Sequence, residues 1–202
     1  MEKDFLEEKD EILVQRSKNG DKEAFDALVQ RYRLPLFRFV YHCIHKQEDA
    51  EDITQESFVK AYLSLSQLKN NSLFKTWLFR IALNLIRDNK RNEKKKPTIS
   101  LDSYIEEEGK DPVAEAEYED GYEEEAESED NELLARLRME ISALPMELRE
   151  VIILRDLQGF SYEEVAKMVG CPVGTVKSRL FYARQILREK LAPFLKDEED
   201  EK

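Results

Sequence analysis

Residues 98–130 carry 15 acidic side chains and one basic side chain, which gives this segment a net charge of −14. Like charges at this density repel one another, and only Tyr104, Tyr118 and Tyr122 supply aromatic surface for a core. We therefore expect a flexible linker, with partial helix formation as an open alternative. It separates a first block, residues 1–97, from a second block, residues 131–195, which an acidic tail follows at residues 196–202.

The net charge of the whole chain, −12 over 202 residues, argues against a nucleic-acid-binding protein, because binding a polyanion requires a basic surface. The distribution of charge changes that conclusion. Residues 12–97 carry 17 basic and 10 acidic side chains, and residues 131–195 carry 10 basic and eight acidic ones. Both blocks are mildly basic, so nucleic-acid binding stays open for each of them.

Apolar residues recur at spacings of three and four in both blocks, as in amphipathic helices. In the first block, Asp21 is expected to cap a helix and Pro35 to lie in the first turn of the next one. Further helices are expected over residues 48–65 and 74–92, with a polar loop between them. The sequence predicts an all-α protein made of two small helical domains.

The second block has the start and stop signals of four helices. Pro145 ends the first, and the second carries Leu157 inward and stops at Gly159. Ser161 and Glu164 form a capping box for the third helix, and Gly170 can end it. The fourth helix follows with Cys171 at the capping position and Pro172 in its first turn. Helix, short turn and helix over residues 161–191 predict a helix-turn-helix motif.

In a helix-turn-helix motif the second helix enters the major groove, so its outward residues are candidates for contacts to bases and phosphates. These candidates are Thr175, Lys177, Ser178, Arg179, Phe181, Tyr182 and Arg184. A plain solvated helix face is the alternative. The capping box, the glycine, the proline and the basic stripe together favour DNA binding.

A second basic stripe lies on the expected helix over residues 74–92. Arg80, Asn84, Arg87 and Arg91 are four, three and four residues apart, so they share one face, which we place opposite Trp77 and Ile81. Such a stripe can hold phosphates and read a base. The preceding loop offers small polar groups that can pocket an unstacked base, from Lys69, Asn70, Asn71 and Ser72. Taken alone, a solvated face is an equally good interpretation.

The expected helix over residues 48–65 has an acidic outer face that repels DNA. Its members are Glu48, Asp49, Glu51, Asp52, Gln55 and Glu56. It is either solvated surface or a docking surface for a basic partner.

Several other classes of function are excluded by what the sequence lacks. The chain has two cysteines and no Gly-rich phosphate loop or nucleophile–base set, so we expect neither an enzyme nor a cofactor. His42, Cys43 and His45 diverge around a helix, so no metal site is expected. Without an 18-residue apolar run or a basic leader we expect no membrane span and a cytoplasmic protein. We expect a monomer in the free state.

Three stretches of the chain resemble the extracytoplasmic-function group of bacterial RNA polymerase sigma factors, in the order found in that family. AEDITQESFVKAY (residues 50–62) is similar to the region that docks on the polymerase clamp helices. FKTWLFRIALNLIRDNKR (residues 74–91) is similar to the region that reads and melts the −10 promoter element. LPMELREVIILRDLQGFSYEEVAKMVGCPVGTVKSRLFYARQILREKL (residues 144–191) is similar to the −35-reading domain.

The resemblance implies a role for each candidate residue. Asp49, Asp52, Gln55 and Glu56 would bind core polymerase. Arg80, Asn84, Arg87 and Arg91 would engage the −10 element, and residues 69–72 would hold a flipped base of the non-template strand. The helix-turn-helix residues would contact −35 DNA. Tyr182 departs from the family, where relatives often carry Arg, so no particular −35 sequence is implied.

The family also implies partners and a path for the linker. The partners are core RNA polymerase, through its clamp helices and flap, promoter DNA, and an anti-sigma factor. In the family the linker threads the polymerase cleft, and its acidity here suits a path built for nucleic acid. We also hypothesise that in the free protein the linker lies against the basic faces of both domains.

A promoter-specificity subunit of RNA polymerase without catalytic activity is the leading interpretation. The alternative is a stand-alone helix-turn-helix regulator that binds operators without polymerase, and a nucleic-acid enzyme is a weak third. The acidic face of residues 48–65 favours the first, because a repressor has no use for it.

Overall fold

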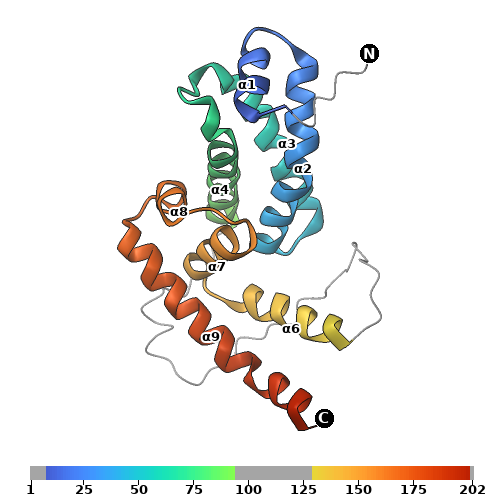
Figure 1. The fold of residues 1–202 in the computed structure, drawn as a ribbon, viewed down its shortest axis with the longest axis vertical. Coiled ribbons are helices and arrows are strands. Elements are labelled where there is room, and N and C mark those ends of the chain that lie inside the picture. The colour runs from blue at the N-terminus through green and yellow to red at the C-terminus, as the bar shows by residue number, and fades with distance from the viewer. Residues whose placement is uncertain (1–7, 94–128, 201–202) are drawn as a thin grey trace.

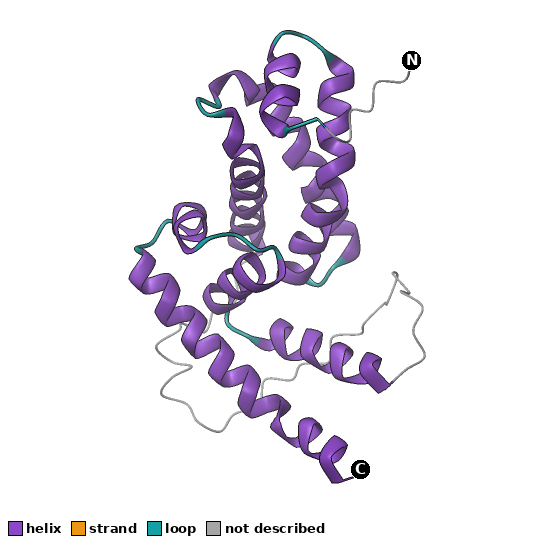
Figure 2. Ribbon diagram, in the orientation of Figure 1, coloured by secondary structure: helices purple, strands orange, loops and turns teal. Residues whose placement is uncertain are grey.

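The computed structural model describes residues 8–93 and 129–200. Residues 98–128 of the expected linker lie outside the described residues. Every regular element of the described part is helical, as Figures 1 and 2 show, and this confirms the all-α prediction. The elements are α1 (Asp10–Lys18), α2 (Lys22–Ile44), α3 (Gln47–Ser64), η1 (Leu65–Gln67), η2 (Asn71–Leu73), α4 (Phe74–Glu93), α6 (Glu129–Ala143), α7 (Met146–Ile152), η3 (Ile153–Leu157), α8 (Tyr162–Val169) and α9 (Val173–Asp200).

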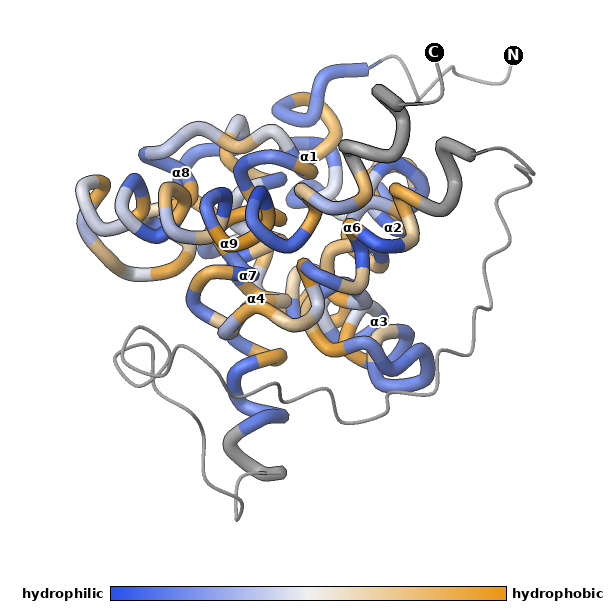
Figure 3. Tube along the Cα trace, turned by 90° about the horizontal axis from the view of Figure 1, so that it is seen from below, coloured by the Kyte–Doolittle hydropathy of each residue, from blue (hydrophilic) through white to orange (hydrophobic). Residues whose placement is uncertain are grey.

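The N-terminal helices α1 to α4 pack around a shared apolar core. Phe39 of α2 and Phe74 and Leu78 of α4 have no exposed surface. Figure 3 shows apolar and hydrophilic residues interleaved along the helices, as expected where each helix buries one side. Among the described residues no helix is both long enough and apolar enough to span a membrane.

Helix α1 was not predicted from the sequence. Its nine residues bury Leu13 and Val14 completely against the bundle, while its exposed residues are polar except for Ile12. Asp10 pairs with Arg31 of α2, and Arg16 bridges Glu8 and Asp21. Because these ties join α1 to α2 along its length, a short helix that is marginal in isolation holds a fixed position.

Helix α2 runs through Pro35, so the prediction of a new helix at that proline is wrong. A proline inside a helix removes one backbone hydrogen bond and costs about 3 kcal/mol. On the two sides of Pro35, Leu28, Leu36 and Phe39 are completely buried along the same side of the helix. Burial of each such side chain contributes about 1.5–3 kcal/mol, which outweighs the break and keeps both halves in line.

The C-terminal helices begin and end close to where the local signals place them. Helix α9 begins at Val173, and the Pro172 carbonyl accepts from the Val176 N–H at 3.1 Å, so the prediction of Cys171 at the capping position is wrong by one residue. Ser161 forms the predicted capping box with Glu164, and Gly170 adopts the left-handed conformation with φ of 76° after α8. Leu157 is an exception, because it is 48% exposed whereas Ile153 and Leu154 are buried. The prediction that Leu157 faces inward is therefore wrong. Leu157 is the last residue of the π-helical turn η3, after the buried run of residues 150–154 has ended.

The two helical domains are packed against each other through α4. Figure 1 shows α7 and α8 beside α4, with α9 leading away from the N-terminal helices. Phe79 of α4 contacts Phe39 of its own domain and, edge to face at 5.0 Å, Phe160 of the C-terminal domain. Phe79 and Leu83 are completely buried, although the sequence pattern had not assigned them to the core. Helix α4 is therefore covered on two sides.

Candidate nucleic-acid interface

The face of α4 that stays open carries Arg80 and Asn84, which are both exposed. The expectation that this stripe lies opposite Trp77 and Ile81 is wrong, because those two side chains are half-buried at its flank. The opposite face is formed by the buried Leu78, Ala82 and Leu85. The side chain of Arg91 lies outside the described residues. Arg80 and Asn84 thus form an accessible pair of a cation and an amide, one helical turn apart.

The four predicted residues of the loop before α4, residues 69–72, differ in their exposure. The side chains of Lys69, Asn70 and Ser72 are exposed. Asn70 stiffens this part, since its Oδ1 accepts from the backbone N–H of Ser72 at 3.1 Å and from its hydroxyl at 2.8 Å. Asn71 instead lies against α1, where Lys18 donates to its side-chain oxygen. Three of the four residues are open to a ligand.

On α9, the exposed candidates for DNA contact are Lys177, Ser178, Phe181, Tyr182 and Arg184, whereas Thr175 and Arg179 are half-buried. The Phe181 and Tyr182 rings meet edge to face at 5.6 Å. Arg184 is held by a bidentate pair with Asp156, at 2.7 and 3.0 Å. This exposed face combines cations, a hydroxyl and aromatic rings, the groups that contact phosphates and base edges.

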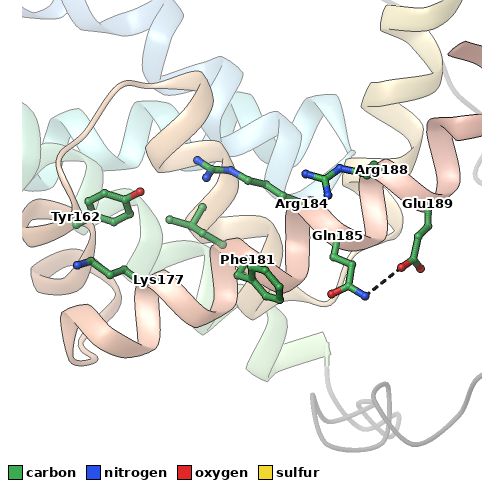
Figure 4. Close-up of a pocket in the computed structure, with 8 residues that line it drawn as sticks. Tyr162, Lys177, Phe181, Arg184, Gln185, Arg188 and Glu189 are labelled. Carbon is green, nitrogen blue, oxygen red and sulfur yellow. Dashed lines mark hydrogen bonds between the residues drawn. The ribbon is translucent and has the colours of Figure 1, made fainter.

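A hollow of about 470 Å³ lies on the same side of α9, shown in Figure 4. Tyr162 of α8 forms one end of it beside Lys177, and Arg184 and Arg188 lie further along α9. The remaining lining residues are Leu180, Phe181, Gln185 and Glu189. Sequence reasoning missed Tyr162 and Arg188. The sequence could have indicated Arg188 as a candidate for DNA contact, because it follows Arg184 by one helical turn.

Glu150 of α7 joins two residues that were predicted to contact different promoter elements. Its carboxylate accepts from Arg87 of α4 at 2.7 and 2.9 Å and lies 3.8 Å from Arg179 of α9. Arg87 also donates to the carbonyl of Val169 at 3.3 Å. Glu150 is only 2% exposed, and burial raises the pKa of its carboxyl while both arginines oppose that rise. In this arrangement Arg87 and Arg179 point into the junction between the domains.

Further polar contacts fix the same junction. Lys75 of α4 donates to the carbonyl of Gln158 at 3.0 Å and lies over the Phe160 ring, 4.4 Å from its centroid. The hydroxyl of Thr76 donates to Glu164 at 2.8 Å. At α4 the domains therefore meet through one aromatic contact flanked by hydrogen bonds, and α2 also contacts α6 and α7.

The acidic face of α3 is open, and it extends beyond the predicted residues. Asp52, Gln55 and Glu56 are exposed, whereas Asp49 is half-buried and pairs with Lys46 at 3.0 Å. Seven and eleven residues after Asp52, on the same face, the apolar Val59 and Leu63 are 51% and 75% exposed. An acidic end and an apolar end form one continuous stripe suited to a protein partner rather than to DNA.

His42, Cys43 and His45 lie at the end of α2, where Cys43 is completely buried and both histidines are half-buried. Burial lowers the pKa of His45 to about 3, helped by Arg149, and raises the pKa of the Cys43 thiol to about 12. Arg149 of α7 donates to the carbonyl of Cys43 at 2.9 Å. Cys43 and His45 therefore lie beside Arg149, where α2 meets α7.

Two family models match the chain. The model for sigma-70 region 2 matches residues 28–96, and the model for sigma-70, region 4 matches residues 134–187. The first match contains α3, α4 and most of α2, and the second contains the capping box and the exposed candidate residues of α9.

Two curated relatives are similar over nearly their whole length. The RNA polymerase sigma-H factor of Pseudomonas aeruginosa is 35% identical over 201 residues, which are 96% of this chain and 99% of the relative. The ECF RNA polymerase sigma-E factor of Escherichia coli K12 is 37% identical over 193 residues, covering 93% and 96%. Among solved structures, the sigma factor RpoE of Bartonella quintana, in complex with the anti-sigma factor NepR, has a TM-score of 0.62. It is 28% identical, over 83% of this chain and 96% of that one.

Proposed function

The chain belongs to the extracytoplasmic-function group of RNA polymerase sigma factors, and from that premise we propose how its described surfaces divide the work. It binds core polymerase and directs promoter-specific initiation by recognising −35 and −10 elements. It acts as a DNA-recognition subunit without catalysis of its own, in the cytoplasm where the polymerase works. Its proposed domains are residues 1–97 and 131–195, with the acidic linker at residues 98–130 between them. Helix α6 begins at Glu129 and α9 continues to Asp200, so the helical part of the second domain extends into the expected linker and the expected acidic tail.

The observation that carries the proposal is the open face of α4 beside the loop. Arg80 and Asn84 are exposed, and so are Lys69, Asn70 and Ser72, while the opposite face of α4 is buried. An arginine can hold a phosphate and an amide can read a base edge. The stiffened loop supplies hydroxyl, amide and ammonium groups for a base that has left the stack. This surface would read and melt the −10 element.

The exposed face of α9 would read the −35 element through Lys177, Ser178 and Phe181. Tyr162, Arg184 and Arg188 around the hollow add a tyrosine and two cations that suit the sugar–phosphate backbone. Tyr182 offers a ring and a hydroxyl in place of a cation, so its contact would depend less on salt than that of an arginine.

The acidic stripe of α3 is what favours a polymerase subunit over a stand-alone regulator. Asp52, Gln55 and Glu56 would bind the clamp helices of core polymerase, and the exposed Val59 and Leu63 would extend that contact with apolar surface. A regulator that binds only DNA gains nothing from an acidic, partly apolar helix face.

The described arrangement must open before both promoter elements are read together. The −10 and −35 positions are about 25 base pairs apart, or about 85 Å along the duplex. Helix α9 spans about 42 Å over its 28 residues, and α8 touches α4 directly through Glu164 and Thr76. The two reading faces cannot be 85 Å apart in this arrangement. Binding to core polymerase would therefore separate the domains and release Arg87 and Arg179 from Glu150.

The test is energy transfer between fluorophores on α4 and α8. Cysteines replace the exposed Asp88 and Lys167, Cys171→Ser removes the accessible native thiol, and buried Cys43 stays unlabelled. Transfer is expected to be efficient in the free chain and to fall on adding core polymerase, because the labels move apart.

Titration with an unrelated basic protein provides the control for charge alone. If energy transfer stays unchanged at saturating core polymerase, the proposal is wrong. That result would favour the alternative, a stand-alone helix-turn-helix regulator. For a stand-alone regulator, energy transfer between the labels would change on adding operator DNA and would not change on adding polymerase.

We also infer an anti-sigma factor as a regulatory partner. The similar sigma factor of Bartonella quintana is bound to the anti-sigma factor NepR in its solved structure. A protein that holds the domains in the packed arrangement would keep Arg87 and Arg179 on Glu150 and so keep the sigma factor inactive.

A further inference from the structure

Lys18, the last residue of α1, contacts the loop that precedes α4 from 50 residues away in sequence. Its Nζ donates to the carbonyl of Leu68 at 2.5 Å and to the side-chain oxygen of Asn71 at 2.7 Å. The side chain is half-buried between the helix and the loop. One ammonium group thus ties both the backbone and a side chain of the loop to α1.

Asn71 completes this contact rather than facing outward with its neighbours. Its amide nitrogen donates to the side-chain oxygen of Gln15 at 3.1 Å, while its oxygen accepts from Lys18. Both ends of the Asn71 amide are therefore engaged by α1. Asn70 and Ser72, on either side of it, stay exposed, and the described hydrogen bonds of their side chains join only these two residues.

The support behind Lys18 is rigid. Leu13 and Val14 anchor α1 in the core with no exposed surface, and Arg16 links it to Asp21 at the start of α2. On the loop side, the buried Leu68 fixes the backbone next to the Lys18 contact. A loop tied between two fixed points keeps its exposed side chains in one geometry, which lowers the entropy lost when a ligand binds.

We propose that Lys18 and Asn71 position the −10 loop and thereby set its base preference, while Lys69, Asn70 and Ser72 make the contacts to DNA. This assignment rests on the proposed function, since it gives the loop a flipped base to read. The sequence predicts the same role for all four loop residues, 69–72. In this proposal Lys69, Asn70 and Ser72 contact DNA, and Asn71 holds the loop in position. Lys18, which no sequence motif indicated, becomes a determinant of specificity that touches no base.

The experiment measures base preference on a pool of transcription templates. The −10 segment is randomised behind a fixed −35 segment, taken from a genomic fragment that the wild-type chain transcribes with core polymerase. Transcripts from the full-length chain and its variants are sequenced, and the preference at each position is the ratio of the best to the worst base. Thermal unfolding of every variant is measured in parallel.

Lys18→Met is expected to lower the preference at the loop-read position about tenfold, because two charge-assisted hydrogen bonds to the loop are lost. Asn71→Ala should have a similar effect. The double variant should be no worse than either single variant, because both changes remove the same brace. Lys18→Arg should restore much of the preference, and Lys22→Met, which removes an exposed cation nearby, should leave it intact.

Three results would overturn the proposal. An unchanged preference in Lys18→Met and Asn71→Ala would show that the brace does not set specificity. Additive losses in the double variant would mean that Lys18 contacts DNA on its own. If no −10 sequence is enriched even with the wild-type chain, the proposed function itself is wrong. If the wild-type chain enriches a −10 sequence and the variants enrich the same one equally, only the role of Lys18 and Asn71 is wrong.

Discussion

Asp52→Arg is expected to weaken binding to core polymerase about 100-fold while the protein stays folded. Asp52 is exposed on α3 and has no described ion pair, so its replacement leaves the core intact. Reversing one charge removes an attraction and adds a repulsion against a basic partner, and a desolvated charge pair lost at an interface costs 2–5 kcal/mol or more. The dissociation constant is measured by fluorescence anisotropy of labelled chain titrated with core polymerase.

The matched control for this variant is Glu23→Arg, which makes the same change of charge on the exposed side of α2. It should bind core polymerase as the wild-type chain does. Equal affinity for wild type and Asp52→Arg would place the docking surface elsewhere. A loss for both variants would show that net charge rather than the α3 stripe governs the affinity.

Arg80→Ala combined with Asn84→Ala is expected to reduce transcription from −10-dependent promoters at least about 100-fold. Each residue is exposed, and the loss of one specific base or phosphate contact costs about 1–3 kcal/mol. Because the two side chains point away from the core and from α3, affinity for core polymerase should be unchanged. The rate of open-complex formation at a fixed concentration of holoenzyme is the measurement.

Asp88→Asn, also exposed on α4, serves as the control and should keep the wild-type rate. The double variant should regain activity on a template whose −10 segment is already unpaired, if melting is the step that Arg80 supports. Wild-type rates in the double variant on duplex templates would remove α4 from promoter reading.

Local signals predicted much of the C-terminal domain. The Ser161 capping box and the left-handed Gly170 depend on residues three or four apart, so the sequence alone contains them. Leu157 was misplaced because it is five residues after Ile152, a spacing that does not belong to one helical face, and it is exposed in the structure. Pro35 was misread because the burial that keeps α2 continuous comes from contacts with other helices.

The contacts between the domains were beyond the reach of the sequence pattern. Phe79 and Leu83 stand at positions that a single-faced helix would leave open, and Phe160 lies more than 75 residues away, beyond the linker. The same holds for Glu150, whose partners Arg87 and Arg179 come from both domains. Helical periodicity describes one buried face and gives no indication of a second one supplied by a distant segment.

In the candidate site too, the sequence indicated residues with a local pattern and missed those that depend on distant contacts. The exposed Arg80, Asn84 and Lys177 follow from helical spacing and were identified by it. The brace of Lys18 on Asn71 joins segments 53 residues apart and depends on the position of α1, an element that the sequence analysis did not predict. Residues that contact a ligand were therefore easier to find than those that hold them in place.

Run-off transcription with purified core polymerase is the most direct measurement of the central claim. A library of genomic fragments is transcribed with core alone, with the chain alone and with both together. Discrete transcripts that start at shared −35 and −10 sequences should arise only when both are present, and Asp52→Arg should abolish them. If no fragment gives a promoter-specific transcript when core and chain are combined, this chain does not act as a sigma factor.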